Sequence, residues 1–128
     1  MEGRKGKLTQ NGVHLEDHEY KTVKLFLEMG YDIELIPPID IQNVHTPDFT
    51  MQGVAWEVKS PKGGAKTTIS HTIKHAVTQS ANLIIDLRRC KIDDESAVEE
   101  LKRHFRLSKR IRRMKIITKT EKVIDLTK

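Results

Sequence analysis

The chain has 128 residues, of which 37% are hydrophobic, 32% charged and 5% aromatic, with a formal net charge of +5. This length suits one modest core, and the composition argues against a disordered chain. The absence of a long apolar run or a secretory signal, together with a lone cysteine, Cys90, predicts a cytoplasmic protein with no membrane partner and no internal disulfide.

The N-terminal third is expected to contain an arm, a helix and a strand. Residues 1–14 are basic, Gly-rich and without periodicity, which predicts a flexible arm. Apolar side chains recur at helical spacing over residues 15–29, and Gly30 follows where a helix cap is expected. Residues 31–36 then predict a strand, which Pro37-Pro38 ends before a loop.

The stretch PDFTMQGVAWEVKSP predicts a β-hairpin. Its residues alternate in polarity, and Gln52-Gly53 is typical of a tight turn. On the second strand the apolar side chains of Val54, Trp56 and Val58 share one face. Glu57 and Lys59 are therefore expected together on the opposite face.

The second half predicts helices alternating with strands. An apolar stripe favours a helix over residues 67–81, and the apolar run at residues 82–87 favours a strand buried on both faces. A helix from Asp93 to Arg106 and two strands at MKIIT and KVIDL complete the chain. We therefore predict a mixed α/β fold, a mixed central β-sheet flanked by helices, in one domain over residues 15–128.

Asp48, Glu57 and Lys59 form the candidate catalytic group. Glu57 and Lys59 lie two apart on one strand and face the same side, and the hairpin is expected to return Asp48 opposite them. Carboxylates of Asp48 and Glu57 with the backbone carbonyl of Val58 would suit Mg²⁺ or Mn²⁺, leaving positions for water and phosphate. Lys59 would then stabilise developing negative charge.

Simpler interpretations of these residues stay open. Glu57 and Lys59 also fit an exposed strand pair, and Asp48 also fits a turn after Pro47. Glu19, on the first helix, is a candidate fourth catalytic carboxylate, although the helix dipole equally favours an acid there.

Several cations are candidate nucleic-acid contacts. The segment from Lys102 to Lys115 is strongly basic, which fits either a polyanion-binding surface or a solvated face. Zinc is not expected, because His71 and His75 have the spacing of a zinc pair but no further ligand nearby. The residues that we expect to contact phosphates are Lys62, Lys74, Gln79, Arg110, Arg112 and Arg113.

These segments together resemble a known family. The stretches HEYKTVKLFLEMGYDIELI, TPDF, WEVKSPKGG, TTISHTIKHAVTQSA, NLIIDLRR and KRIRRMKIIT resemble PD-(D/E)XK nucleases, and among them the toxin C-terminal domains of contact-dependent growth inhibition and related polymorphic toxin systems. The resemblance implies a restriction-endonuclease-like core, metal-dependent cleavage of tRNA, and a cognate immunity protein as a partner. It implies that Asp48 and Glu57 are metal ligands, Lys59 the catalytic lysine and Glu19 the helix-borne acid.

Two other functions fit the same residues. A DNA endonuclease would use the same centre, because cation and carboxylates do not distinguish the two sugars. A nucleic-acid-binding protein without catalysis would rely on the basic segment alone. The sequence does not decide between RNA and DNA or give the oligomeric state.

Overall fold

Seven strands and three helices make up residues 4–42 and 44–128, which are the residues that the computed structural model describes. The strands pair in the order β1 to β7 in a mixed sheet, which confirms the predicted mixed α/β class. The chain divides into two compact units, Met1–Trp56 and Glu57–Lys128, and each is described here by itself. The expectation of one domain over residues 15–128 stays a prediction.

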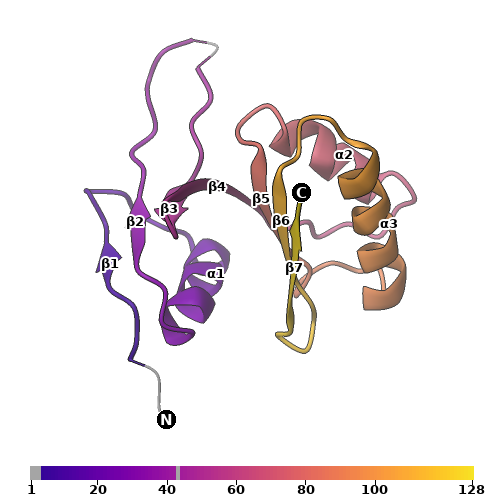
Figure 1. Ribbon diagram of the computed structural model, residues 1–128, viewed down its shortest axis with the longest axis horizontal. Helices are drawn as coiled ribbons and strands as arrows, with labels where there is room; N and C mark the ends of the chain where they lie inside the picture. Colours follow the sequence, from indigo (N-terminus) through magenta and orange to yellow (C-terminus); the bar gives the residue numbers. More distant parts are fainter. Residues whose placement is uncertain (1–3, 43) are drawn as a thin grey trace. The chain divides into compact units, whose positions relative to one another are not determined.

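The first unit holds one helix and short strands (Figure 1). Its elements are β1 (Leu8–Thr9), α1 (Asp17–Glu28), β2 (Ile33–Leu35), β3 (Phe49–Met51) and the first half of β4 (Val54–Lys59). β1 pairs with β2 in parallel, whereas β2 with β3 and β3 with β4 are antiparallel.

Helix α1 lies within the span predicted for it. Val23 and Phe26 are buried, and the backbone N–H of Glu16 donates to Oε1 of Glu19 at 2.8 Å, which closes the first turn. The helix ends before Gly30, whose φ of 97° is the left-handed conformation that glycine adopts most easily.

The predicted flexible arm is wrong for the residues that form β1. Leu8 pairs with Ile33, and the backbone N–H of Ile33 donates to the carbonyl of Lys7 at 2.9 Å. Gly6 lies so close to the backbone of Tyr31 that a Cβ would stand 1.7 Å from the Tyr31 carbonyl oxygen. Backbone hydrogen bonds and a close approach fix this segment, and neither leaves an apolar pattern in the sequence. Residues 1–3 of the arm lie outside the described residues.

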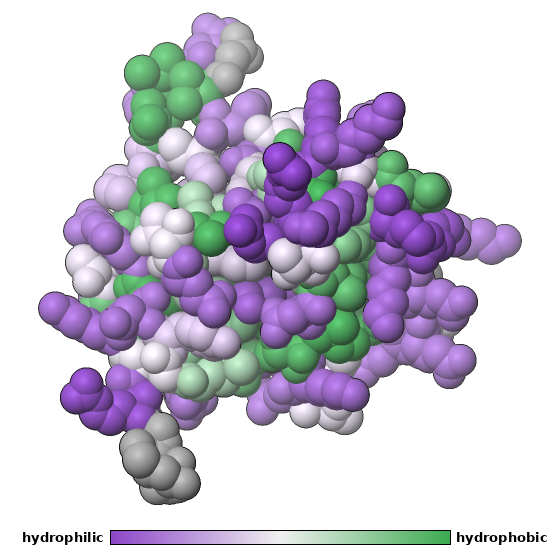
Figure 2. Space-filling model, viewed as in Figure 1, coloured by the Kyte–Doolittle hydropathy of each residue, from purple (hydrophilic) through white to green (hydrophobic). Residues whose placement is uncertain are grey.

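The β3–β4 hairpin is confirmed, including its turn. Gln52 and Gly53 have φ values of 58° and 72°, as expected of a two-residue turn that matches the twist of its strands. The loop between β2 and β3 instead exposes apolar side chains, with Ile39 49% and Ile41 63% exposed. Figure 2 shows an apolar patch at this protruding loop.

The second unit is built around three parallel strands, with β5 in the middle. Its elements are the second half of β4, α2 (Thr68–Ala76), β5 (Asn82–Asp86), α3 (Asp94–Leu107), β6 (Arg113–Ile117) and β7 (Val123–Thr127). β5 pairs in parallel with both β4 and β6, and β7 joins β6 antiparallel. Leu83, Ile84 and Ile85 are fully buried, which confirms the predicted central strand.

Helices α2 and α3 lie on the same side of β5, β6 and β7 (Figure 1). Ile69 and Ile73 of α2 join Leu101 of α3 in one apolar cluster with the strands. α2 is shorter than predicted, because the chain leaves the helix in tight turns after Ala76. Among the described residues, no helix combines the length and apolarity needed to cross a membrane.

Candidate active site

The ammonium of Lys59 lies between two side-chain oxygens in the second unit. Its Nζ is 3.0 Å from Oε2 of Glu57 and donates to Oε1 of Gln79 at 2.8 Å. Glu57 and Lys59 share a face of β4, as their spacing predicted, and Gln79 comes from the turn after α2. One strand and one helix end therefore hold the lysine in place.

Glu57 is deeply buried and Lys59 is not. Glu57 is 2% exposed, and the Lys59 side chain is 28% exposed. Burying a carboxylate is costly unless charge and hydrogen bonds compensate for it, and Lys59 supplies an opposite charge at contact distance. The simpler interpretation of an exposed Glu57–Lys59 strand pair is therefore wrong.

The structure explains how the sequence positions this pair. Glu57 and Lys59 stand in register with Leu83 and Ile85 of the buried strand β5, and Val58 stands between them opposite Ile84. Ladder hydrogen bonds to a fully buried strand leave β4 little freedom to slide.

Asp48 and Glu19 belong to the first unit. The backbone N–H of Asp48 donates to the carbonyl of Trp56 at 2.9 Å, directly before Phe49 pairs with Trp56. Asp48 is thus fixed beside Trp56 within the hairpin. Glu19 accepts a hydrogen bond from the backbone N–H of Glu16, so its carboxylate stabilises the start of α1, as the simpler interpretation expected.

The expected metal ligands are oxygen donors: two carboxylates and one carbonyl. This donor set suits Mg²⁺ or Mn²⁺ and lacks the imidazole and thiolate groups that zinc favours. Neither unit, in the part of the chain that the structure describes, has three or more His, Cys, Asp or Glu side chains grouped to hold a metal.

A second ion pair follows the end of β5. Arg88 donates to both carboxylate oxygens of the buried Asp86, with Nη2 to Oδ2 at 2.8 Å and Nε to Oδ1 at 3.0 Å, and its Nη1 reaches Glu121. The hydrogen bonds that Arg88 donates to Asp86 are the main reason that the pKa of Arg88 is raised above its usual value. This pair fixes the backbone that leads out of β5. It was not predicted, because an Asp-x-Arg spacing occurs in many loops and carries no specific signal.

The predicted phosphate contacts divide into two groups. Lys62, Lys74, Arg110 and Arg112 are exposed, and Arg113 is exposed with Nη1 donating to Asn82. Gln79 differs, because its oxygen already accepts from Lys59. Lys115, at the end of the basic segment, is 6% exposed with Nζ 2.6 Å from Asp125, so the basic surface stops before it.

Comparison with known proteins identifies the family. The family model for the contact-dependent growth inhibition CdiA C-terminal domain matches residues 45–123. A chain of the CdiA-CT/CdiI toxin and immunity complex from Burkholderia pseudomallei has a similar fold, with a TM-score of 0.73 and 16% identity over 96% of this chain and 100% of that one. At this identity the likeness concerns the fold alone, and no curated protein matches the sequence.

The family match extends over more than half of the chain and includes Asp48, Glu57, Lys59 and Gln79. It ends before the last residues of β7 and begins after α1, so Glu19 lies outside it. The chain belongs to the family of CdiA C-terminal domains of contact-dependent growth inhibition.

Proposed function

We propose that this chain is a toxin domain that acts as a metal-dependent endonuclease and hydrolyses phosphodiester bonds of RNA, with tRNA as the first substrate to test. The observation that carries the proposal is the position of Lys59, held at 3.0 Å from the buried Glu57 and at 2.8 Å from Gln79. A lysine fixed beside a buried carboxylate is a preorganised positive charge for a phosphate that gains negative charge during cleavage.

The carboxylates of Asp48 and Glu57 and the carbonyl of Val58 would hold the cation. Their oxygens match the hard-ligand preference of Mg²⁺ or Mn²⁺, and three protein oxygens leave positions for water and a phosphate oxygen. When bound, the cation supplies Lewis-acid activation of the phosphate and lowers the pKa of a coordinated water.

The residues of the chain would divide the remaining work. Glu57 would bind the metal ion, and its contact with Lys59 determines the position of the ammonium group. Lys59 donates to the phosphate oxygens, and Gln79 restricts the lysine side chain to one orientation. Glu19 keeps the weaker role of a further acid, since its carboxylate already caps α1.

Phosphate contacts outside the centre would come from exposed cations. Arg110, Arg112 and Arg113 stand near the start of β6, and Lys62 and Lys74 lie on the loop and helix that follow β4. The proposed partners are thus RNA and, by analogy with the toxin and immunity complex of similar fold, a cognate immunity protein. The proposed place of action is the cytoplasm, where tRNA is found.

The test is a cleavage assay with total tRNA and with plasmid DNA, comparing the wild type with Lys59→Ala. We expect tRNA cleavage with Mg²⁺ or Mn²⁺, little with Ca²⁺ or a chelator, and a loss in the variant. A melting curve should show stabilisation by Mg²⁺, because the ion binds only the folded chain. Equal activity in a chelator, with no shift in melting, would overturn the metal mechanism.

The same assay separates the DNA alternative. Cleavage of plasmid DNA at a rate matching or exceeding that of tRNA would reassign the substrate while keeping the centre. Binding of both polymers without cleavage of either would favour the nucleic-acid-binding alternative.

A further inference from the structure

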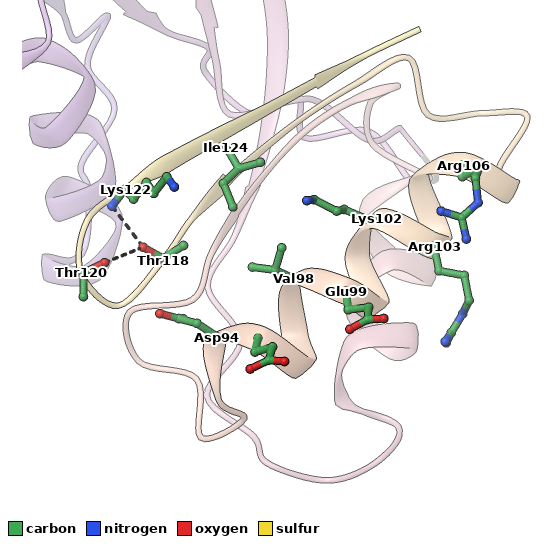
Figure 3. A pocket seen from close by; sticks show the side chains of 11 residues that line it. Asp94, Val98, Glu99, Lys102, Arg103, Arg106, Thr118, Thr120, Lys122 and Ile124 are labelled. Carbon is green, nitrogen blue, oxygen red and sulfur yellow. Dashed lines mark hydrogen bonds between the residues drawn. The ribbon is translucent and has the colours of Figure 1, made fainter.

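A pocket of about 680 Å³ lies between α3 and β7 in the second unit (Figure 3). Val98 and Ile124 contribute its apolar part, and both pack against the buried core. Figure 3 shows Val98 and Lys102 extending from α3 toward Ile124, with Glu99 and Arg103 farther out. The volume is in the range that binds a small ligand or one group of a larger one.

Three cations of the pocket have no ion-pair partner among the described residues. Lys102 and Arg106 lie four apart on α3, so they share one side of the helix, and Lys122 adds a third positive charge from the connection to β7. By contrast, Arg103 lies 4.0 Å from Glu100. Lys102 and Arg106, one helical turn apart, can together bind an anion with several oxygens, such as a phosphate group. Lys122 lies beside Thr118 and Thr120 at the other end of the pocket (Figure 3).

The pocket also has acceptors nearer the start of α3 than Lys102 and Arg106. Glu95 and Glu99 line it and make no ion pair within the described part of the chain. Glu99 and Arg106 are seven residues apart on α3, which corresponds to about 10 Å along the helix axis. A ligand that fits has a negative group at one end, an apolar flat body, and N–H donors at the other end.

A nucleotide has this arrangement of groups. Its phosphate would meet Lys102 and Arg106, and its base would lie against Val98 and Ile124. The exocyclic amino group of adenine, cytosine or guanine would donate to a carboxylate such as Glu99, whereas uracil has no amino group and offers only its ring N3–H. To lie against Val98 and Ile124 the base must leave its stack, which an unpaired loop nucleotide does most easily.

We propose that this pocket binds one unstacked, amino-bearing nucleotide of the RNA substrate, at an exosite separate from the cleavage centre. This inference rests on the proposed function, because it takes RNA as the substrate. β4, which carries Glu57 and Lys59, and β7 lie at opposite ends of the strand order of the second unit. Three strand spacings put them about 14 Å apart, so one RNA would contact both places only by spanning several nucleotides.

The test measures RNA affinity in the Glu57→Gln background with a chelator, so that cleavage does not interfere. The probes are a labelled RNA stem–loop with an unpaired adenosine-rich loop, the same stem–loop with a uridine loop, and a fully paired RNA of equal charge. Lys102→Ser/Arg106→Ser is compared with Lys21→Ser/Lys24→Ser, which removes the same charge from exposed positions on α1.

We expect the pocket variant to weaken adenosine-loop binding by about tenfold, and binding of the paired RNA by much less. Glu95→Gln/Glu99→Gln should reduce the preference for the adenosine loop over the uridine loop. Equal losses on paired and looped RNA, losses equal to those of the α1 control, or equal competition by a poly-glutamate peptide would each overturn the exosite.

A separate measurement, the cleavage assay of the wild type, would show failure of the proposed function. It would be the absence of metal-dependent RNA cleavage by the wild type, and the binding comparison would still be readable. An exosite that fails while the wild type cleaves RNA would leave the cleavage centre standing.

Discussion

Two places in the second unit differ in how their positive charges are paired. One is the Lys59 cluster, formed by Lys59, Glu57 and Gln79, and the other is the α3 pocket, the pocket between α3 and β7. Lys59 contacts two partners, and one of them is a carboxylate that is 2% exposed. Lys102 and Arg106 are exposed and have no ion pair among the residues described. A cation that contacts other side chains of the fold is held in one position, as a catalytic group must be. An exposed cation without an ion pair is available to bind a ligand.

The largest expected effect comes from removing the two proposed metal-binding carboxylates. Asp48→Ala and Glu57→Ala should each lower kcat by about a thousandfold or more, since each removes a proposed metal ligand. Cleavage assays give the rates, and circular dichroism shows whether the fold persists.

The control for this pair is Glu28→Ala, which removes an exposed carboxylate at the end of α1. Full turnover in both Asp48→Ala and Glu57→Ala would contradict the metal centre. A loss of helical signal in either would mean that unfolding caused the loss.

The second prediction tests whether Gln79 positions Lys59. Gln79→Ala should lower kcat by about ten- to a hundredfold with little change in KM, because the lysine then samples more orientations. Gln79→Glu keeps an oxygen acceptor at the same length and should restore much of the rate. A rise in KM alone would show instead that Gln79 contacts RNA, as first expected from the sequence.

The third prediction concerns affinity without chemistry. Replacing Arg110, Arg112 and Arg113 with Ala should weaken RNA binding and reduce the slope of log K against log salt by about two, since fewer counterions are released. The rate at saturating RNA should change little. Titrations at several salt concentrations measure the slope.

A matched triple variant, Lys5→Ala/Lys21→Ala/Lys24→Ala, removes three exposed cations from the first unit. If the salt slope of RNA binding is unchanged in the arginine variant, or changes equally in both variants, the basic segment is a solvated face and does not bind RNA.

The smallest effect concerns the start of α3, the helix that carries the pocket. The Asp93 carboxylate accepts from the backbone N–H of Ser96 at 2.9 Å, and this hydrogen bond lowers the pKa of Asp93. A lowered folded-state pKa gives stability that is present above the unfolded pKa of about 3.9 and is lost as the pH falls through the folded value.

Asp93→Ala should therefore melt slightly below the wild type at pH 7, and the difference should shrink as the pH falls below 4. Asp93→Asn keeps an acceptor without a titrating group, so its melting should not lose this contribution in acid. Melting curves from pH 7 to 3 provide the measurement. A constant difference between wild type and Asp93→Ala across this range would contradict the assignment.

The elements that the sequence predicted best are those with a strong local pattern. The Gln52-Gly53 turn, the buried strand at Leu83 to Ile85 and the glycine after α1 each depend on a few neighbouring residues, and each is confirmed. The pairing of Glu57 with Lys59 followed from strand periodicity alone.

The features that were missed depend on residues far apart in the sequence. β1 forms because Leu8 and Thr9 pair with β2, which follows α1 in the sequence. Two residues of backbone pairing give no periodic signal. Gln79 was assigned to RNA because the helix was expected to continue to residue 81. Its contact with Lys59, twenty positions earlier, depends on where α2 ends, and helix ends are poorly determined by propensity.

The pairing of β1 with β2 also has a consequence for handling the protein. An N-terminally shortened chain without residues 1–9 would leave one edge of β2 with open N–H and C=O groups next to the apolar Ile33 and Leu35. Such edges recruit strands from other molecules, so the shortened chain is expected to aggregate while still containing every proposed catalytic residue. Solubility, rather than activity, is where the loss of this short strand would first be noticed.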